Sequence, residues 1–309
     1  MMRKIKTAVI TGPTGAIGIA LCNLLLKNGI KVYAVCRPDS SRASNLPDGV
    51  IKIDCDLGEL DTLKNKIDSD ADVFYHFGWA NTTGSGRNDM YSQNLNVKYT
   101  LDAVHAAKDL GCKVFIGSGS QAEYGRVDGT IRPDTPCFPE NGYGMAKLCA
   151  GRMSRVECEK LGIDFVWTRI LSVYGPYDGQ GSMISTVIRK LLNGEKPSLT
   201  AGTQMWDYVY SDDAAKAFYL MAQCGVCGKT YIIAGGHSMP LKNYVEILRN
   251  TIGPELPLGF GEVEAANPVS LTADIALTTE DTGFVPEISF EDGIARTIDY
   301  IKNINTVGK

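Results

Sequence analysis

The chain has 309 residues, 44% hydrophobic and 21% charged, values typical of a globular protein with a large buried core. Its formal net charge of −4, without basic clusters, argues against nucleic acid or an acidic membrane surface as a partner. No apolar run approaches the length of a membrane span, and the first residues lack the features of a secretory signal, so we expect a cytoplasmic protein.

The nine cysteines are odd in number and scattered through apolar segments, which favours reduced, buried thiols. Cys224 and Cys227 form a single C-x-x-C without a second pair or a nearby histidine, which favours a plain loop over a zinc or redox site. The chain has only three histidines, so we expect no metal centre.

Apolar runs of strand length alternate with segments of helix length through the first half of the chain. Strands buried on both faces give such runs, and repeated strand–helix units form a parallel, doubly wound sheet. The expected strands cover residues 5–11, 31–36, 50–54, 72–76, 113–117 and 164–170. The expected helices cover residues 15–28, 59–67, 88–110 and 143–161.

This alternation loosens after Gly175 and Pro176. We expect one domain over 1–175 and a smaller mixed lobe over 176–309, with some of its segments returning to the main sheet and a ligand cleft between the two parts. The helices expected in the lobe cover residues 182–193, 211–222, 240–250 and 289–303, and the short strands lie near 198–200, 208–210 and 230–234.

A glycine turn joins the first expected strand to the first expected helix. Glycine permits the tight turn, and it lets backbone N–H groups approach a pyrophosphate at the helix N-terminus. A second strand ends about twenty residues further on, so the context of a dinucleotide-binding site is complete. The cofactor contacts expected in this turn are Gly12, Thr14, Gly15, Ala16, Ile17 and Gly18.

The end of the second strand distinguishes NAD from NADP, because an acid there binds the ribose hydroxyls and a basic residue tolerates a 2′-phosphate. No carboxylate stands at Cys36, and Arg37 follows it, which leans toward NADP and leaves NAD open. Arg37 could instead stack on the adenine or be solvated. Asp56 and Leu57, after the third strand, could meet the adenine through a side-chain oxygen and the backbone.

Tyr143 and Lys147 lie one helical turn apart. In this composition chance alone gives about one Tyr-x-x-x-Lys, so the pair is informative only through its surroundings. The pKa of an unperturbed tyrosine is about 10. A lysine on the same helix face favours the phenolate, because its positive charge stabilises the negative one.

With these elements the chain resembles the extended short-chain dehydrogenase/reductases, and more narrowly the NAD-dependent epimerase/dehydratase family acting on nucleotide sugars. The resemblance covers nearly the whole chain and implies a Rossmann-type sheet with a smaller substrate lobe. Its motifs follow the family's order: TGPTGAIG at 11–18, Asp56-Leu57, HFGW at 76–79, NVKYT at 96–100, GSGSQAEYG at 117–125, YGMAK at 143–147, RILSVYGP at 169–176 and WDYVYSDDAAKA at 206–217.

The resemblance also implies roles for single residues. Tyr143 would be the acid/base for a sugar hydroxyl while hydride moves to or from the nicotinamide, and Lys147 would also hold the nicotinamide ribose. Ser120 would hydrogen-bond the reacting oxygen, although it could simply cap a loop. The further cofactor contacts implied by the motifs are Phe77, Gly78, Trp79 and Asn96.

The chain departs from the family at the substrate positions. Gln121 and Ala122 stand where 4,6-dehydratases carry an acid pair, which disfavours dehydration. Ser172 replaces an asparagine, and Trp206 replaces an arginine that commonly grips the nucleotide diphosphate. Trp206 could stack on a base or sugar, or only pack at an interface. Glu123 is either a partner of a sugar hydroxyl or a loop carboxylate.

The expected function is NAD(P)-dependent chemistry at C4 of a nucleotide-linked hexose, by epimerisation or by 4-keto reduction. Ser172 and Trp206 weaken the case for a diphosphate, so reduction of a small non-nucleotide carbonyl is a rival. A dinucleotide sensor without catalysis would not need the intact set of Ser120, Tyr143 and Lys147.

The helices expected at 88–110 and 143–161 carry apolar residues on more than one face. In the family such helices form a four-helix dimer interface. We therefore expect a homodimer.

Overall fold

Seven parallel strands form the main sheet of the computed structural model, which describes residues 2–264 and 269–307. The strand order β10-β6-β5-β4-β1-β2-β3 is that of a doubly wound sheet, as predicted. The strands are β1 (Thr7–Thr11), β2 (Lys31–Cys36), β3 (Ile51–Asp54), β4 (Val73–His76), β5 (Val114–Ser120), β6 (Asp164–Ile170) and β10 (Thr230–Ile233).

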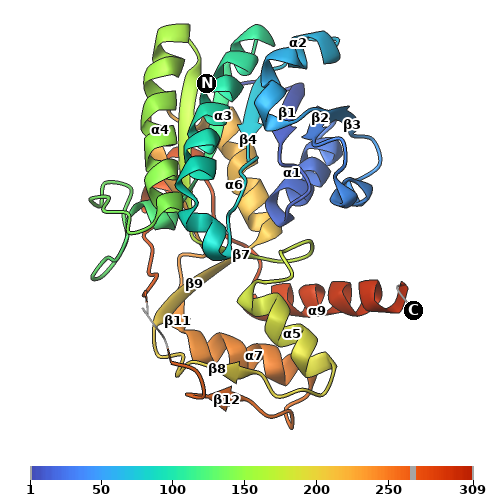
Figure 1. Ribbon diagram of the computed structural model, residues 1–309, viewed down its shortest axis with the longest axis vertical. Helices are drawn as coiled ribbons and strands as arrows, with labels where there is room; N and C mark the ends of the chain where they lie inside the picture. The colour runs from blue at the N-terminus through green and yellow to red at the C-terminus, as the bar shows by residue number, and fades with distance from the viewer. Residues whose placement is uncertain (1, 265–268, 308–309) are drawn as a thin grey trace.

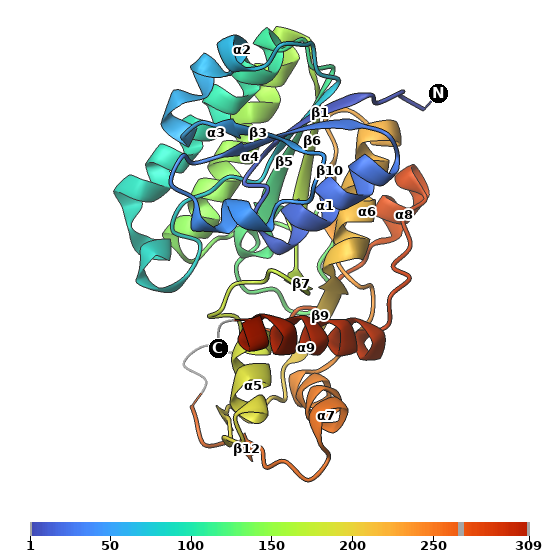
Figure 2. The ribbon, with the colours of Figure 1, turned by 90° about the vertical axis from the view of Figure 1, so that its right-hand side faces the viewer.

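Helices cover both faces of this sheet (Figure 2). Successive residues of a strand point to opposite faces, so Val9 of β1 packs on one side and Ala8 and Ile10 pack on the other. One face carries α1 (Ala16–Lys27), α6 (Ser211–Cys224) and α8 (Ala276–Thr282). The other carries α3 (Met90–Asp109), α4 (Gly142–Leu161), the 3₁₀ segment Leu57–Thr62 and α2 (Leu63–Lys66).

The second lobe lies below the main sheet in Figure 1. Its helices share an apolar core that includes Ile188, Leu248 and Ile298. They are α5 (Met183–Leu192), α7 (Leu241–Ile252) and α9 (Phe290–Val307). Its strands are β7 (Ser172–Tyr174), β9 (Met205–Tyr210) and β11 (Ser238–Pro240) in one sheet, and β8 (Ser198–Leu199) and β12 (Gly259–Phe260) in another.

The predicted return of the chain to the main sheet is made by β10, which pairs with β6. The helix expected over 59–67 is wrong in type: a 3₁₀ segment comes first, with Glu59 in a non-helical conformation, and the α-helix has only one turn. The prediction also missed β7, β11, β12 and α8. The boundary at residue 175 stays a proposal.

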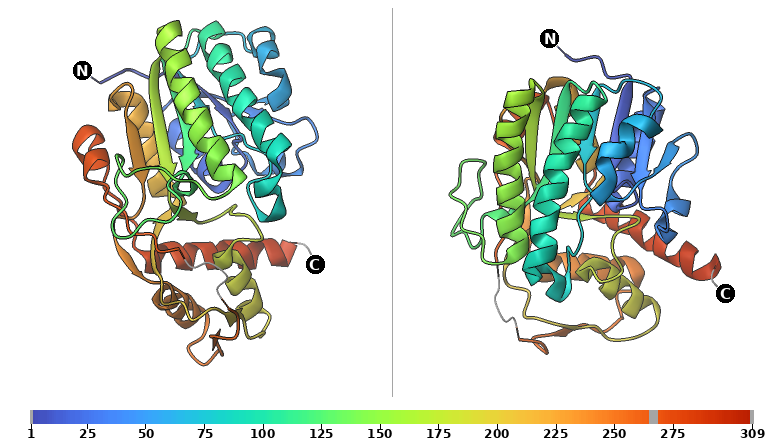
Figure 3. Two further views of the ribbon diagram at one scale, coloured as in Figure 1. Left: turned by 60° about the vertical axis from the view of Figure 1, so that its left-hand side comes forward. Right: turned by 45° about the horizontal axis from the view of Figure 1, so that its top comes forward.

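The carboxyl ends of the parallel strands face the second lobe, and α3 and α4 begin at the same level (Figures 1 and 3). In doubly wound sheets this edge is where ligands bind. Among the residues with described coordinates, no helix is long and apolar enough to cross a membrane.

Candidate active site

The glycine turn brings backbone segments close together at the end of β1. Gly12 has a φ of 66°, a left-handed conformation, and a Cβ there would stand 2.7 Å from the backbone nitrogen of Gly78. A Cβ at Gly18 would stand 2.5 Å from the carbonyl oxygen of Pro13, so glycine lets α1 lie against the turn. Nothing lies within 4 Å of a Cβ at Gly15, so this approach to α1 is open.

The N-terminus of α1 suits a diphosphate. Gly15 is the N-cap residue, no side chain caps the helix, and no acidic residue lies in its first turn. The first N–H groups of a helix have no partner within it and bind phosphate oxygens. Thr14, Ala16 and Ile17, which flank this opening, are all partly exposed. The geometry fits the cofactor contacts expected here.

The residues expected near the adenine lie at the same edge of the sheet. Arg37 is exposed and directly follows β2. Asp56 caps the 3₁₀ segment, because its Oδ1 accepts the N–H of Gly58 at 3.0 Å. The side chain of Leu57 lies beside Gly78, where a Cβ would stand 2.7 Å from a Leu57 methyl group.

His76 ties β1, β4 and α3 together. Thr11 Oγ1 lies 2.9 Å from its Nδ1, and Thr100 Oγ1 lies 3.3 Å from its Nε2. Burial, with the nearby charge of Lys147, lowers the pKa of His76 to about 3, so the imidazole is neutral.

The segment after β4 is held by backbone and side-chain hydrogen bonds. The N–H of Phe77 donates to the Thr11 carbonyl, and that of Gly78 donates to the Thr11 hydroxyl. Asn96 is buried in α3, donates to the carbonyl of Ala80 at 3.0 Å and accepts its N–H at 2.9 Å. Asn96 therefore anchors this segment, and its expected contact with a cofactor stays a prediction.

Ser120, Tyr143 and Lys147 come together from two elements. Ser120 ends β5, and Tyr143 and Lys147 lie in the first turns of α4. The Nζ of Lys147 donates to the carbonyl of Ser118 at 2.5 Å and lies 5.8 Å from the centroid of the Tyr143 ring. The pair therefore lies beside the carboxyl end of β5.

Trp79 covers the lysine. The Lys147 Nζ lies 3.8 Å from the centroid of the Trp79 ring, a cation–π geometry. The indole meets the Tyr143 ring edge-on at 6.1 Å, and its N–H donates to Gln93 Oε1 at 2.9 Å. The motif that predicted a cofactor contact at Trp79 gave no sign of this packing.

Burial sets the protonation of the pair. Burial raises the pKa of Tyr143, whereas the hydrogen bond with the Ser120 hydroxyl and the charge of Arg87 both lower it. It lowers the pKa of Lys147 to about 7, against the charge of Glu123. Both shifts favour neutral groups, because a low-dielectric surrounding penalises charge. The phenol therefore holds a proton unless a cation stabilises its ionised form.

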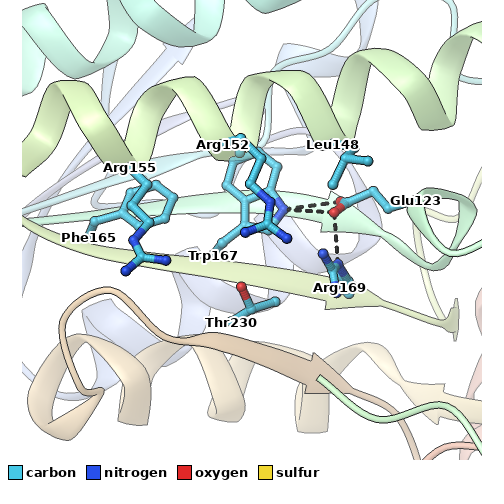
Figure 4. A pocket seen from close by; sticks show the side chains of 9 residues that line it. Glu123, Leu148, Arg152, Arg155, Phe165, Trp167, Arg169 and Thr230 are labelled. Atoms are coloured by element: carbon cyan, nitrogen blue, oxygen red, sulfur yellow. Dashed lines mark hydrogen bonds and ion pairs between the residues drawn. The ribbon is translucent and has the colours of Figure 1, made fainter. Parts of the chain in front are cut away.

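Glu123 is fully buried and binds inward (Figure 4). Its carboxylate accepts Arg169 Nε–H at 2.8 Å, Trp167 Nε1–H at 3.0 Å and the backbone N–H of Ser120 at 2.8 Å. These donors hold the carboxylate from inside the protein, which favours the structural alternative, and Glu123 fixes the backbone of Ser120. A contact of Glu123 with the substrate stays a prediction.

Ser172 and Trp206 lie in the three-stranded sheet of the second lobe. Ser172 of β7 pairs with Tyr208 of β9, and the ring of Trp206 lies 6.3 Å from that of Tyr208. Trp206 also packs against the cluster that contains Tyr124 and Leu171. Packing accounts for part of the Trp206 surface, and substrate contacts by the two residues stay predictions.

Arg87 was missed by the sequence analysis. Its Cζ lies 4.4 Å from the centroid of the Tyr143 ring. The surrounding TGSGRND gives no periodic pattern, and only the folded chain brings this loop against α4.

The cysteines are free thiols, and Cys224 and Cys227 lie around the end of α6. Within the described part of the chain, no three His, Cys, Asp or Glu side chains gather as a metal site.

Known proteins resemble this chain in sequence and fold. The profile of the NAD dependent epimerase/dehydratase family matches residues 8–234. A putative UDP-glucose 4-epimerase of Methanocaldococcus jannaschii is 26% identical, over 96% of this chain and 99% of its own length.

Two solved structures share the fold over nearly the whole chain. A UDP-N-acetylglucosamine 4-epimerase of Methanobrevibacter ruminantium, in complex with UDP-N-acetylmuramic acid, superposes with a TM-score of 0.88 at 25% identity, over 98% of this chain and all of that one. A UDP-glucuronic acid 4-epimerase of Bacillus cereus, in complex with NAD, superposes with a TM-score of 0.83 at 23% identity. The match covers 96% of this chain and 99% of that one. The family match covers most of the chain, so this protein belongs to the NAD-dependent epimerase/dehydratase family and is an enzyme that works with a nicotinamide dinucleotide.

Proposed function

We propose that the protein is a nucleotide-sugar 4-epimerase with Tyr143 as its acid/base. The observation that carries this proposal is the meeting of Ser120, Tyr143 and Lys147 beside the end of β5, on the same sheet edge as the open glycine turn. The relatives with the same fold are named as 4-epimerases of UDP-sugars, which supports chemistry at C4.

In this proposal, Tyr143 Oη removes the proton from the C4 hydroxyl and later returns it. Ser120 hydrogen-bonds the same sugar oxygen, and Lys147 in its charged form favours the phenolate. The nicotinamide ring, when bound, supplies the hydride acceptor and donor. Inversion at C4 requires the sugar to present both faces to that ring, so the site must allow the hexose to turn.

The residues proposed to hold the cofactor follow the sheet edge. The N–H groups around Gly15 would bind the diphosphate, and Asp56 and Leu57 would meet the adenine. Arg37 would lie at the adenosine ribose, where its charge would tolerate a 2′-phosphate.

A second candidate is 4-keto reduction with NADPH, favoured by the exposed Arg37 and by the lack of an acid at Cys36. A reductase delivers hydride once and must exchange its cofactor, whereas an epimerase regains its cofactor in every turnover. Thermal stabilisation by NAD compared with NADP would report the preference of this chain.

The test is an incubation of the purified protein with UDP-glucose, UDP-N-acetylglucosamine or UDP-glucuronate, with NAD or NADP, followed by proton NMR of the anomeric region. We expect the C4 epimer of at least one sugar to accumulate to a fixed ratio. If no epimer forms, and the protein instead oxidises NADPH when given a 4-keto-6-deoxy nucleotide sugar, the second candidate replaces the first.

We also propose a homodimer formed through α3 and α4, which lie side by side on one face (Figure 3). A groove of about 530 Å³ on this face includes Leu101 and Val156 among its lining residues. Large exposed apolar patches mark interfaces, and a two-fold axis would cover this one with its own copy. The exposed apolar side chains are Met90, Tyr91, Leu95, Met145, Met153 and Val156.

The nine free thiols favour the cytoplasm as the location that we propose.

A further inference from the structure

We propose that Arg87 binds a carboxylate at C6 of the hexose, so that the substrate is a nucleotide-linked hexuronic acid. This inference rests on the proposed function, because it takes C4 of the sugar to react at Tyr143.

Arg87 brings an uncompensated positive charge to the tyrosine. Its Cζ lies 4.4 Å from the centroid of the Tyr143 ring, and among the described residues its side chain forms one hydrogen bond, a long one of 3.4 Å to the carbonyl of Thr82. Throughout residues 2–264 and 269–307, no carboxylate forms an ion pair with Arg87. The side chain is partly exposed, so an incoming anion can reach it.

The loop that carries Arg87 is fixed at both ends. Asn88 Oδ1 accepts the N–H of Gly142, the first residue of α4, at 2.9 Å. Gln93 Nε2 donates to the carbonyl of Gly86 at 3.0 Å. A Cβ at Gly142 would stand 3.0 Å from the carbonyl oxygen of Arg87, so the loop lies directly on the start of α4. A cation held in this way loses little conformational entropy when an anion binds.

The Arg87 guanidinium lies over the Tyr143 ring, with its Cζ 4.4 Å from the ring centroid. The N–H groups point outward in its plane, where they match the two oxygens of a carboxylate. Arg87 can therefore keep its contact with the ring and bind an anion along its edge.

The geometry of a pyranose decides which anion this is. C1, which carries the nucleotide diphosphate, stands opposite C4, whereas C5 and its C6 substituent are next to C4. C3 is also next to C4, but it carries a neutral hydroxyl, so an anion beside the cation that lies against the phenol would be a carboxylate at C6 rather than the diphosphate. A neutral hydroxymethyl group at C6 would leave the charge unpaired, and a carboxylate would neutralise it.

The experiment compares the kcat/KM of epimerisation for UDP-glucuronate and for UDP-glucose in the wild type, Arg87→Gln, Arg87→Lys and the control Arg155→Gln. Arg155 is an exposed arginine of α4 that lines another groove (Figure 4), and Tyr143 is not among the lining residues of that groove. We expect the wild type to prefer UDP-glucuronate. Arg87→Gln should lower kcat/KM for UDP-glucuronate by about 10- to 100-fold, mostly through KM, because a charge-assisted hydrogen bond is lost.

With UDP-glucose, Arg87→Gln should lower kcat/KM by a clearly smaller factor than with UDP-glucuronate, because the phenolate loses a nearby cation but the neutral sugar has no charged partner to lose. Arg87→Lys should fall between the wild type and Arg87→Gln on UDP-glucuronate, because it keeps the charge without the planar fork. The control variant should match the wild type on both sugars.

Equal losses on both sugars, with the basic limb of the kcat–pH profile moved upward, would show that Arg87 acts only on the phenol and would overturn the proposal. Turnover of UDP-glucose with none of UDP-glucuronate would overturn it while leaving the 4-epimerase function intact. A wild type that epimerises neither these sugars nor any other nucleotide sugar would remove both proposals.

Discussion

Lys147 illustrates how one side chain depends on its surroundings. Burial lowers its pKa to about 7, but the Trp79 ring and the Ser118 carbonyl are both placed to stabilise the charged ammonium. Trp79 therefore excludes water from the lysine while offering it a π face. Trp79, which the motif predicted only as a cofactor contact, therefore contacts both members of the pair that we propose for proton transfer.

His76 predicts how the protein responds to acid. Its pKa is about 3 in the folded state against a model value of 6.5, so between these values the unfolded chain binds more protons. The free energy of unfolding should therefore fall as pH decreases from 6.5 toward 3, by up to about 1.4 kcal/mol per pH unit from this residue.

Urea unfolding of the wild type and of His76→Gln at about pH 6.5 and pH 5 checks this sign. The variant should lose less stability on acidification than the wild type, because glutamine does not titrate. An identical loss in both proteins would show that other groups cause the acid sensitivity.

Sequence order predicted which residues gather at the site but not where their polar atoms point. Ser120, Tyr143 and Lys147 lie together because their motifs end or begin elements at one sheet edge. Glu123 and Asn96 are predicted to contact ligands, and the fold shows that each side chain also has hydrogen-bond partners far along the chain or on another element. Such partners leave no local pattern in the sequence.

The position of α4 depends on glycines that let it lie close to the sheet. A Cβ at Gly151 would stand 2.6 Å from Cε2 of the Trp167 ring, and a Cβ at Gly144 would stand 2.2 Å from the carbonyl oxygen of Ala122. Because α4 carries Tyr143, an outward shift of this helix would move the phenol away from β5.

We predict that Gly151→Ala destabilises the protein by about 1–3 kcal/mol, despite the better helix propensity of alanine, because the added methyl overpacks against the indole. The kcat of epimerisation should fall as well, while cofactor affinity changes little, since the glycine turn is elsewhere. Thermal unfolding and kcat check this, with the exposed Glu159→Ala as the control. A Gly151→Ala protein as stable and active as the wild type would contradict the packing argument.

The length of an element decided whether it could be predicted. Apart from β3 at the edge, which is largely exposed, the strands of the main sheet give apolar runs because both of their faces are buried. β7, β11 and β12 have only two or three residues each, which is too few for an alternation of apolar and polar residues to be recognised. The helix expected over 59–67 has the composition of a helix, but its chain turns at Glu59, where φ is −124°.

Across the whole molecule, the alternation of strands and helices predicted the doubly wound sheet and the return of a later segment to it. The sequence could not predict that α6 and α8 pack on the main sheet while α5, α7 and α9 build a separate core. That division depends on which apolar faces meet, and similar amphipathic helices can serve either lobe.

The proposed dimer makes a prediction about assembly. Val156, 65% exposed on α4, should be covered by the partner, so Val156→Glu should give monomers by light scattering coupled to size exclusion. Val285→Glu is the matched control, because Val285 is 51% exposed and lies outside α3 and α4. A wild-type monomer, or dissociation by the control as strongly as by Val156→Glu, would contradict this interface.

The kcat of Tyr143→Phe in the nucleotide-sugar epimerisation assay tests the central claim most directly, because the variant removes one oxygen and keeps the ring. We predict a loss of at least about 100-fold, as expected for a lost acid/base group, with thermal stabilisation by the cofactor unchanged. A variant that keeps kcat within about 3-fold of the wild type would contradict the claim, since an acid/base group contributes far more than that.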